Sequence, residues 1–138
     1  MCGIAGLINL DGKSIDPNIL KAMTDAVAHR GPDGEGQWIA GPIGIGHRRL
    51  AVIDLSSQAS QPMISNNKRY VLSYNGEIYN FLEIRKELEK KGYKFYSNSD
   101  TEVVLNAIIE WNSNALLKFN GMFSLCFWDN ETKKLLLA

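Results

Sequence analysis

"MCGIAGLINL", residues 1–10, places a cysteine directly behind the initiator methionine. From Gly3 onward this stretch is apolar at odd and even positions alike, which predicts a first strand that is buried on both faces. A buried cysteine normally lies within such a strand, where it packs as a small hydrophobic residue. Cys2 lies instead at the end of the chain, where packing does not explain it.

A cysteine at the amino terminus has a chemical use. If Met1 is removed, Cys2 carries a nucleophilic thiol and a free α-amino group, whose ordinary pKa is about 8. That amine can take the thiol proton directly or through one water, as in enzymes that use an N-terminal threonine. Cys2 considered alone still favours a chance placement over this role.

The remaining elements predict an α+β fold with layers built around antiparallel sheet. Helices are expected from the Asp16–Pro17 cap, from Asn80 with Glu83 as a capping box and an end at Gly92, and from Ser99–Asp100. The first helix should bury a face formed by Ile19, Leu20, Met23, Ala26 and Val27. Further strands are expected at 36–40, 43–47, 49–54, 69–74, 122–129 and 133–138.

Composition excludes several classes of protein. The 138 residues fit one domain and carry no net charge, which argues against a nucleic-acid partner. No signal peptide or membrane-spanning run occurs, so we expect a cytoplasmic protein with reduced thiols. The few cysteines and histidines lack the spacing of a zinc site, and a Cys2–Cys126 disulfide has little to support it. The chain stops inside an apolar strand, so we expect a fragment of a longer protein.

Three further positions each allow a structural and a chemical interpretation. Asn75-Gly76 is a typical hairpin turn, or an oxyanion hole made from the Asn75 amide and the Gly76 N–H. Arg49 covers a strand edge, or binds a carboxylate through both guanidinium nitrogens. Asp100 caps its helix, or accepts hydrogen bonds from an ammonium group. Cys126 lies within an apolar strand, and packing explains it fully.

Taken together, the motifs resemble one family. They occur in the order and spacing of the glutaminase domain of glutamine-hydrolysing asparagine synthetases. That domain is a class II glutamine amidotransferase with the N-terminal nucleophile hydrolase fold, which implies a four-layer α/β/β/α sandwich of antiparallel sheets, here incomplete at its C-terminal end. The motifs are MCGIAG (1–6), HRGPDGEG (29–36), GHRRLAVIDL (46–55), QP (61–62), SYNGEIYNF (73–81), SDTEV (99–103) and GMFSLCFWD (121–129).

The resemblance implies a role for each candidate residue. Cys2 would be the nucleophile after loss of Met1, and Asn75 with Gly76 would form the oxyanion hole. Arg30 would help to position the catalytic residues without contacting the substrate. The glutamine substrate would be bound by Arg49 at its α-carboxylate, by Asp100 at its α-ammonium, and by the surroundings formed by Leu50, Val52, Ile53 and Glu77.

The resemblance also implies what lies outside this chain. Residues 1–138 would be the N-terminal portion of the glutaminase domain, and the synthetase domain, which binds ATP, aspartate and magnesium, is absent. No cofactor or metal is therefore expected here, and the implied partners are glutamine and the synthetase domain, with a homodimer left open. Two alternatives remain: an amidotransferase that serves another acceptor, such as a sugar, a polysaccharide precursor or a β-lactam-type product, and a non-catalytic relative. An intact Cys2, Arg49, Asn75 and Asp100 argues against the second.

Overall fold

The computed structural model describes residues 2–138, which form two antiparallel sheets and three α-helices. The first sheet has the strand order β1-β3-β2 and the second has the order β4-β5-β6-β7. The strands are β1 (Gly3–Ile8), β2 (Gly34–Ala40), β3 (Ile43–Arg49), β4 (Met63–Ile64), β5 (Tyr70–Ile78), β6 (Gly121–Asp129) and β7 (Lys134–Leu137). The helices are α1 (Pro17–Ala26), α2 (Phe81–Lys90) and α3 (Asp100–Trp111), with short 3₁₀ segments at Ala28–Arg30, Ser57–Ala59 and Asn112–Lys118.

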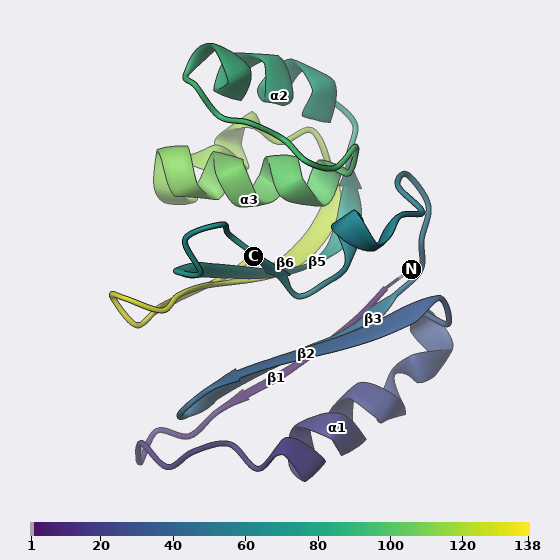
Figure 1. Cartoon of the computed structure of the whole chain (residues 1–138), viewed down its shortest axis with the longest axis vertical. Helices are drawn as coiled ribbons and strands as arrows, with labels where there is room; N and C mark the ends of the chain where they lie inside the picture. Colours follow the sequence, from purple (N-terminus) through teal and green to yellow (C-terminus); the bar gives the residue numbers. More distant parts are fainter. Residues whose placement is uncertain (1) are drawn as a thin grey trace.

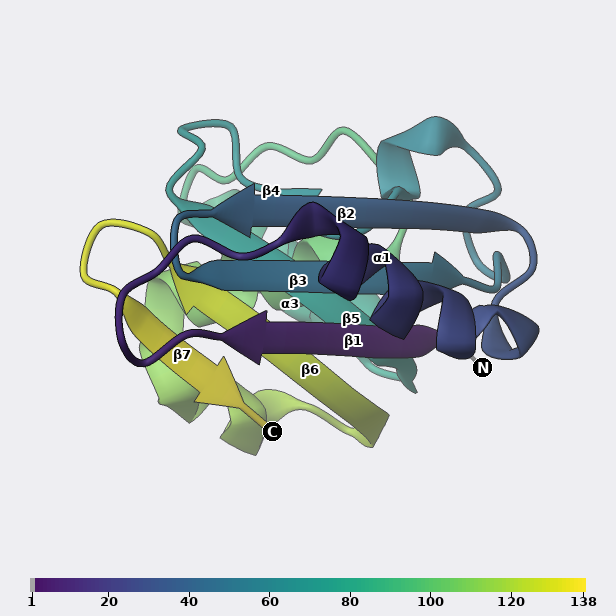
Figure 2. The same ribbon diagram turned by 90° about the horizontal axis from the view of Figure 1, so that it is seen from below.

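These elements stack in four layers (Figure 1). Helix α3 lies on the outer face of the β4–β7 sheet and α2 packs on α3, farther from the sheet, while α1 covers the outer face of the β1–β3 sheet. The two sheets face each other, and their strands cross obliquely, as Figure 2 shows. The predicted α+β architecture with an α/β/β/α sandwich is therefore confirmed.

Two apolar clusters hold the layers together. The larger lies between the β4–β7 sheet and the helices α2 and α3, and the smaller lies between the two sheets. Fully buried members of the larger cluster include Leu72, Ile78, Leu88, Val103 and Val104. The smaller cluster consists of Ile43, Ile45, Val71, Cys126 and Trp128.

Helix α1 begins at the predicted cap, where the Asp16 carboxylate accepts from the Asn18 N–H over 2.8 Å. Its predicted apolar face is wrong, because Ile19 is 52% exposed and the buried residues are Leu20 and Thr24. Thr24 can lie against the sheet because Gly46 has no side chain: a Cβ there would lie 2.2 Å from Thr24 Oγ1. The Thr24 hydroxyl donates to the Leu20 carbonyl over 2.8 Å, so its burial leaves no unpaired donor.

The start of α2 differs from the prediction in its capping. Asn80 is the N-cap residue, but its side chain makes no capping hydrogen bond, so the predicted capping box with Glu83 is wrong. The Asn80 amide instead donates to the Lys118 carbonyl over 2.9 Å and accepts from the Asn120 N–H over 3.0 Å. It therefore ties the end of β5 to the start of β6. The predicted end of this helix at Gly92 and the start of α3 at Ser99–Asp100 are confirmed.

Two strand predictions are wrong, and so is the hairpin-turn alternative for Asn75-Gly76. β1 is an edge strand with Ile8 41% exposed, so it is not buried on both faces. Residues 50–56 form a loop, where a strand over 49–54 was expected. Asn75-Gly76 does not turn the chain, because β5 runs on to Ile78 and pairs along its whole length with β6. Cys2 and Cys126 are both free thiols.

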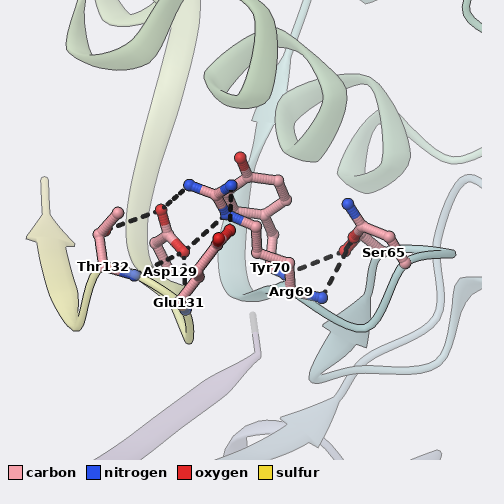
Figure 3. Close-up of polar contacts among 7 residues, drawn as sticks. Ser65, Arg69, Tyr70, Asp129, Glu131 and Thr132 are labelled. Atoms are coloured by element: carbon pink, nitrogen blue, oxygen red, sulfur yellow. Dashed lines mark hydrogen bonds and ion pairs between the residues drawn. The ribbon is translucent and has the colours of Figure 1, made fainter.

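A cluster of charged side chains lies at the end of the β5–β6 pair where β5 begins and β6 ends (Figure 3). The Arg69 guanidinium donates to both carboxylate oxygens of Asp129, over 2.9 and 2.7 Å, and also pairs with Glu131. The same guanidinium lies over the Tyr70 ring, 4.8 Å from its centroid. The Thr132 hydroxyl donates to Asp129 over 2.8 Å, so this carboxylate orders the β6–β7 turn as well.

Candidate active site

A cavity of about 200 Å³ opens between the loop after β3, the middle of β5 and the first turn of α3. Every residue predicted as nucleophile, oxyanion donor or substrate contact lines it, namely Cys2, Arg49, Leu50, Val52, Ile53, Asn75, Gly76, Glu77 and Asp100. Sequence elements that are far apart along the chain thus meet at one place. A concave site with a few convergent polar groups is typical of small-molecule binding.

Cys2 lines this cavity and lies just before β1 begins. Its Sγ accepts from the Leu50 N–H over 3.3 Å and lies 3.7 Å from the Leu50 carbonyl, to which the thiol donates. A main-chain N–H that faces the sulfur stabilises negative charge as it develops there. Arg30 reaches the same residue from outside, and its Nε donates to the Cys2 carbonyl over 2.9 Å. The predicted removal of Met1 concerns a position outside the described residues.

Asn75 and Gly76 lie in the middle of β5. Asn75 contributes its side chain to the cavity, and Gly76 contributes its main chain. Side chains alternate across a strand, so Asn75 lies on the same face as Ser73, which contacts His47 of the other sheet over 2.8 Å. The Asn75 amide therefore lies on the face of β5 that is turned toward the other sheet, and it lines the same cavity as Cys2. Gly76 is exposed and contributes main chain alone.

Asp100 is the first residue of α3, and only 4% of it is exposed. The Tyr74 hydroxyl donates to its Oδ2 over 2.8 Å, and the Ile78 N–H donates to the same oxygen over 3.1 Å. Burial raises the pKa of the Asp100 carboxyl, while these two donors partly oppose that shift. A cation bound in the cavity would favour the ionised carboxylate.

Arg49 ends β3 and is held in place by the loop that follows. Its guanidinium donates to the Ser56 carbonyl over 2.9 Å and to the Asp54 carbonyl. The Asp54 side chain accepts from the Ser56 N–H over 2.8 Å and from the Asn98 N–H over 2.9 Å. These contacts, led by the one from Ser56, hold the pKa of the Asp54 carboxyl below its usual range. The loop thus holds the Arg49 guanidinium at the cavity through several hydrogen bonds.

Sequence reasoning missed two residues of this site. Tyr74 holds Asp100 through its phenol, and burial raises the pKa of that phenol far above its usual range. Gln61 lines the cavity and bonds to the main chain of Tyr74. The QP motif at residues 61–62 was a signal for Gln61, although the motif alone gives no chemical role.

The chain matches known proteins along its whole length. A family model described as the glutamine amidotransferase domain matches residues 1–138. The chain belongs to the glutamine amidotransferase domain family. A glutamine-hydrolysing asparagine synthetase of Bacillus subtilis (strain 168) is 39% identical over 134 residues, which cover 95% of this chain. The amidase chry2 of Gibberella zeae is 31% identical over 150 aligned positions that cover the whole chain.

The glutamine amidotransferase domain also has a solved structural neighbour. A glutamine phosphoribosylpyrophosphate amidotransferase from B. subtilis, complexed with ADP and GMP, aligns with a TM-score of 0.75 at 22% identity over 92% of this chain. At that identity the likeness shows a shared fold. The domain spans about a fifth of the two relatives named above, 21% and 22% of their lengths. Within residues 2–138, no helix is long and apolar enough to cross a membrane, and no cluster of three His, Cys, Asp or Glu side chains could hold a metal ion.

Proposed function

We propose that this domain hydrolyses the side-chain amide of glutamine and supplies the ammonia for synthesis of asparagine from aspartate. The observation that carries the proposal is that Cys2, the Asn75–Gly76 strand segment, Arg49 and Asp100 all line one small cavity. A thiol, an anion-stabilising group and two oppositely charged side chains are the parts that an amide hydrolase for a zwitterionic amino acid needs.

Glutamine fits this arrangement in one orientation. Its α-carboxylate pairs with the Arg49 guanidinium, which the loop carbonyls of Asp54 and Ser56 hold in place. Its α-ammonium pairs with Asp100, which Tyr74 and Ile78 orient. The carboxamide then extends toward Cys2. Leu50, Val52, Ile53 and Glu77 line the remaining wall.

The reaction proceeds by acyl transfer after loss of Met1. The free α-amino group of Cys2 takes the thiol proton and becomes an ammonium. The thiolate then forms a C–S bond to the carboxamide carbon, and the carbonyl π electrons move to the oxygen. That oxyanion is stabilised by the Asn75 amide and the Gly76 N–H. The C–N bond then breaks, and the nitrogen leaves as ammonia with a proton from the Cys2 α-ammonium. Water attacks the resulting glutamyl thioester, which releases glutamate and restores the thiol.

The ammonia acceptor lies outside this chain. We assign ATP, magnesium and aspartate to a synthetase domain of the same protein, because the asparagine synthetase relatives are several times longer than this domain. Among residues 2–138, no group of three His, Cys, Asp or Glu side chains is placed to hold magnesium. A second acceptor class is also a candidate, since the relative from Gibberella zeae is an amidase, chry2, and not an asparagine synthetase by name.

Product analysis of the full natural protein tests this function. We expect glutamate and ammonia from glutamine alone, and labelled asparagine when aspartate, ATP and magnesium are added with amide-labelled glutamine. Glutamate release without any asparagine would favour the other acceptor class. No glutamate release by the wild-type protein would overturn the proposal.

A further inference from the structure

The Gln61 side chain makes a paired contact with the main chain of β5. Its Nε2 donates to the Tyr74 carbonyl over 3.0 Å, and its Oε1 accepts from the Tyr74 N–H over 2.6 Å. A main-chain N–H can only donate and a carbonyl can only accept, so this contact fixes which way round the amide lies. Gln61 is 8% exposed, and both bonds are buried.

The Gln61 amide takes the place of a missing strand residue. β4 pairs with β5 so that Met63 lies opposite Leu72 and Ile64 opposite Val71. Two residues further along, the same register would place the main chain of residue 61 opposite Tyr74. β4 has ended there, and the amide supplies the donor and acceptor that a continuing strand would have offered.

The main chain of Gln61 lies close against the other sheet. A Cβ on Gly36 of β2 would lie 2.1 Å from the Gln61 carbonyl oxygen, so only glycine permits this approach. Gln61 therefore packs its main chain against β2 and bonds its side-chain amide to β5. It joins the two sheets at the rim of the cavity.

The contact lies immediately beside the Gly76 N–H. In an antiparallel strand the N–H groups of alternate residues point to the same edge, so Gly76 shares the edge that Tyr74 presents to Gln61. Among residues 2–138, no side chain or loop carbonyl accepts from the Gly76 N–H. The residues on either side of it along this edge are satisfied. Their partners are Ser65 for Tyr70, Met63 for Leu72, Gln61 for Tyr74 and Asp100 for Ile78.

We propose that Gln61 is a positioning residue that ends strand pairing at Tyr74 and so aims the free Gly76 N–H at the developing oxyanion. The proposal rests on the glutaminase function above. A continuing strand would have covered the Gly76 N–H, and an unpaired Tyr74 would leave this edge of β5 free to shift. An amide that bonds Tyr74 and goes no further avoids both outcomes.

This role predicts a specific kinetic defect. The oxyanion exists only in the transition state, so poor aim of its donor lowers kcat and leaves ground-state binding of glutamine unchanged. Removal of a whole oxyanion donor costs on the order of 100- to 1,000-fold in kcat. Poor orientation of a donor that is still present should lower kcat by less, on the order of 10- to 100-fold.

The test uses Gln61→Met in the full natural protein, because methionine has a similar length and cannot form either bond. Gln58→Met is the matched control, since Gln58 is exposed and lies three residues earlier in the chain. We expect the kcat for glutamine hydrolysis to fall in Gln61→Met, with KM within about threefold of wild type. Gln58→Met should match wild type in both. The rate at which a small alkylating reagent modifies Cys2 should be unchanged, because the nucleophile is intact.

The outcomes separate this proposal from the proposed function. If wild type releases no glutamate, the glutaminase assignment fails. If wild type is active and Gln61→Met keeps the wild-type kcat, whether or not its KM rises, the positioning role of Gln61 fails. Should Gln61→Met not fold, Gln61→Glu keeps the acceptor for the Tyr74 N–H and is measured in the same way. Unfolding of both variants would assign the amide to stability alone and would overturn the proposal.

Discussion

The Arg30 guanidinium holds Cys2 by its main chain: Nε donates to the Cys2 carbonyl over 2.9 Å. Arg30 lies at the end of the 3₁₀ segment that follows α1, so this bond connects the helical layer to the start of β1. A residue at the end of a chain has few constraints of its own. The bond therefore restrains the main chain of Cys2, while Leu50 contacts its sulfur.

Arg30→Met should reduce turnover without removing the nucleophile. The apolar part of the side chain is kept and the donor to Cys2 is lost, so Cys2 gains freedom at the chain end. We expect kcat for glutamine hydrolysis to fall by about 10-fold, because small misplacements of reacting groups are costly. Steady-state kinetics checks this, and an unchanged kcat would show that Arg30 does not position Cys2.

Arg49→Lys should weaken glutamine binding. Arg49 bonds two loop carbonyls, and a lysine ammonium cannot reproduce that planar fork while pairing with a carboxylate. A charge-assisted pair of this kind contributes about 2–3 kcal/mol. The glutamine KM should rise by roughly 10- to 100-fold, more than kcat falls. An unchanged KM in the purified full-length variant would rule out this role for Arg49.

His47 should make the protein sensitive to mild acid. Its side chain is fully buried, and burial, with a smaller contribution from Arg49, lowers its pKa to about 4. An unfolded histidine has a pKa of about 6.5, so the unfolded chain binds the additional proton between these values. Stability is then present above pH 6.5 and is lost as the pH falls toward 4. The free energy of unfolding should drop by about 3 kcal/mol over this range because of His47.

Chemical denaturation at several pH values measures this effect. His47→Gln should remove most of the pH dependence between 6.5 and 4, while His29→Gln, at an exposed histidine, should retain it. Asp100 acts in the opposite direction, because its raised pKa favours the folded state at lower pH. Its contribution is the same in both variants and cancels in the comparison. Equal pH dependence in His47→Gln and wild type would contradict the assignment.

Asp129 should act in a lower pH range. Its hydrogen bonds from Arg69, and then from Thr132 and the turn, hold the pKa of the Asp129 carboxyl well below its usual range (Figure 3). A depressed carboxyl pKa contributes stability above about pH 3.9 that is lost as the pH falls further. Asp129→Asn should therefore lower the Tm at pH 7 and flatten its further decline below pH 3.9. Thermal unfolding at pH 7 and at several pH values below about 3.9 checks this. An unchanged Tm at pH 7 would be inconsistent with the role of Asp129.

The sequence predicted the layers of this fold better than it predicted the local geometry of the cavity. Cap residues such as Asp16 and Ser99 act within one turn, so their helices could be located from neighbouring residues. Asn75-Gly76 has the composition of a hairpin turn, but pairing with Ser124 and Phe123 of β6 keeps it extended. That pairing joins segments far apart in the chain and is invisible to a dipeptide pattern.

The predicted strand over 49–54 failed for a related reason. Its apolar residues Val52 and Ile53 are 71% and 39% exposed at the cavity, so their apolar character does not reflect burial in a sheet. Gln61 escaped prediction because its role depends on where β4 ends relative to Tyr74. Only the paired strands show that an amide replaces a strand residue there.

Glutamate release by a pair of cysteine variants tests the central claim most directly. Cys2 and Cys126 are both free, and only Cys2 lines the cavity; Cys126 is buried between the sheets. In the full natural protein, Cys2→Ala should lose glutamine hydrolysis while it remains folded, and Cys126→Ala should retain it. Synthesis from added free ammonia should survive in both variants. Glutamine hydrolysis at the wild-type rate by Cys2→Ala would contradict the account.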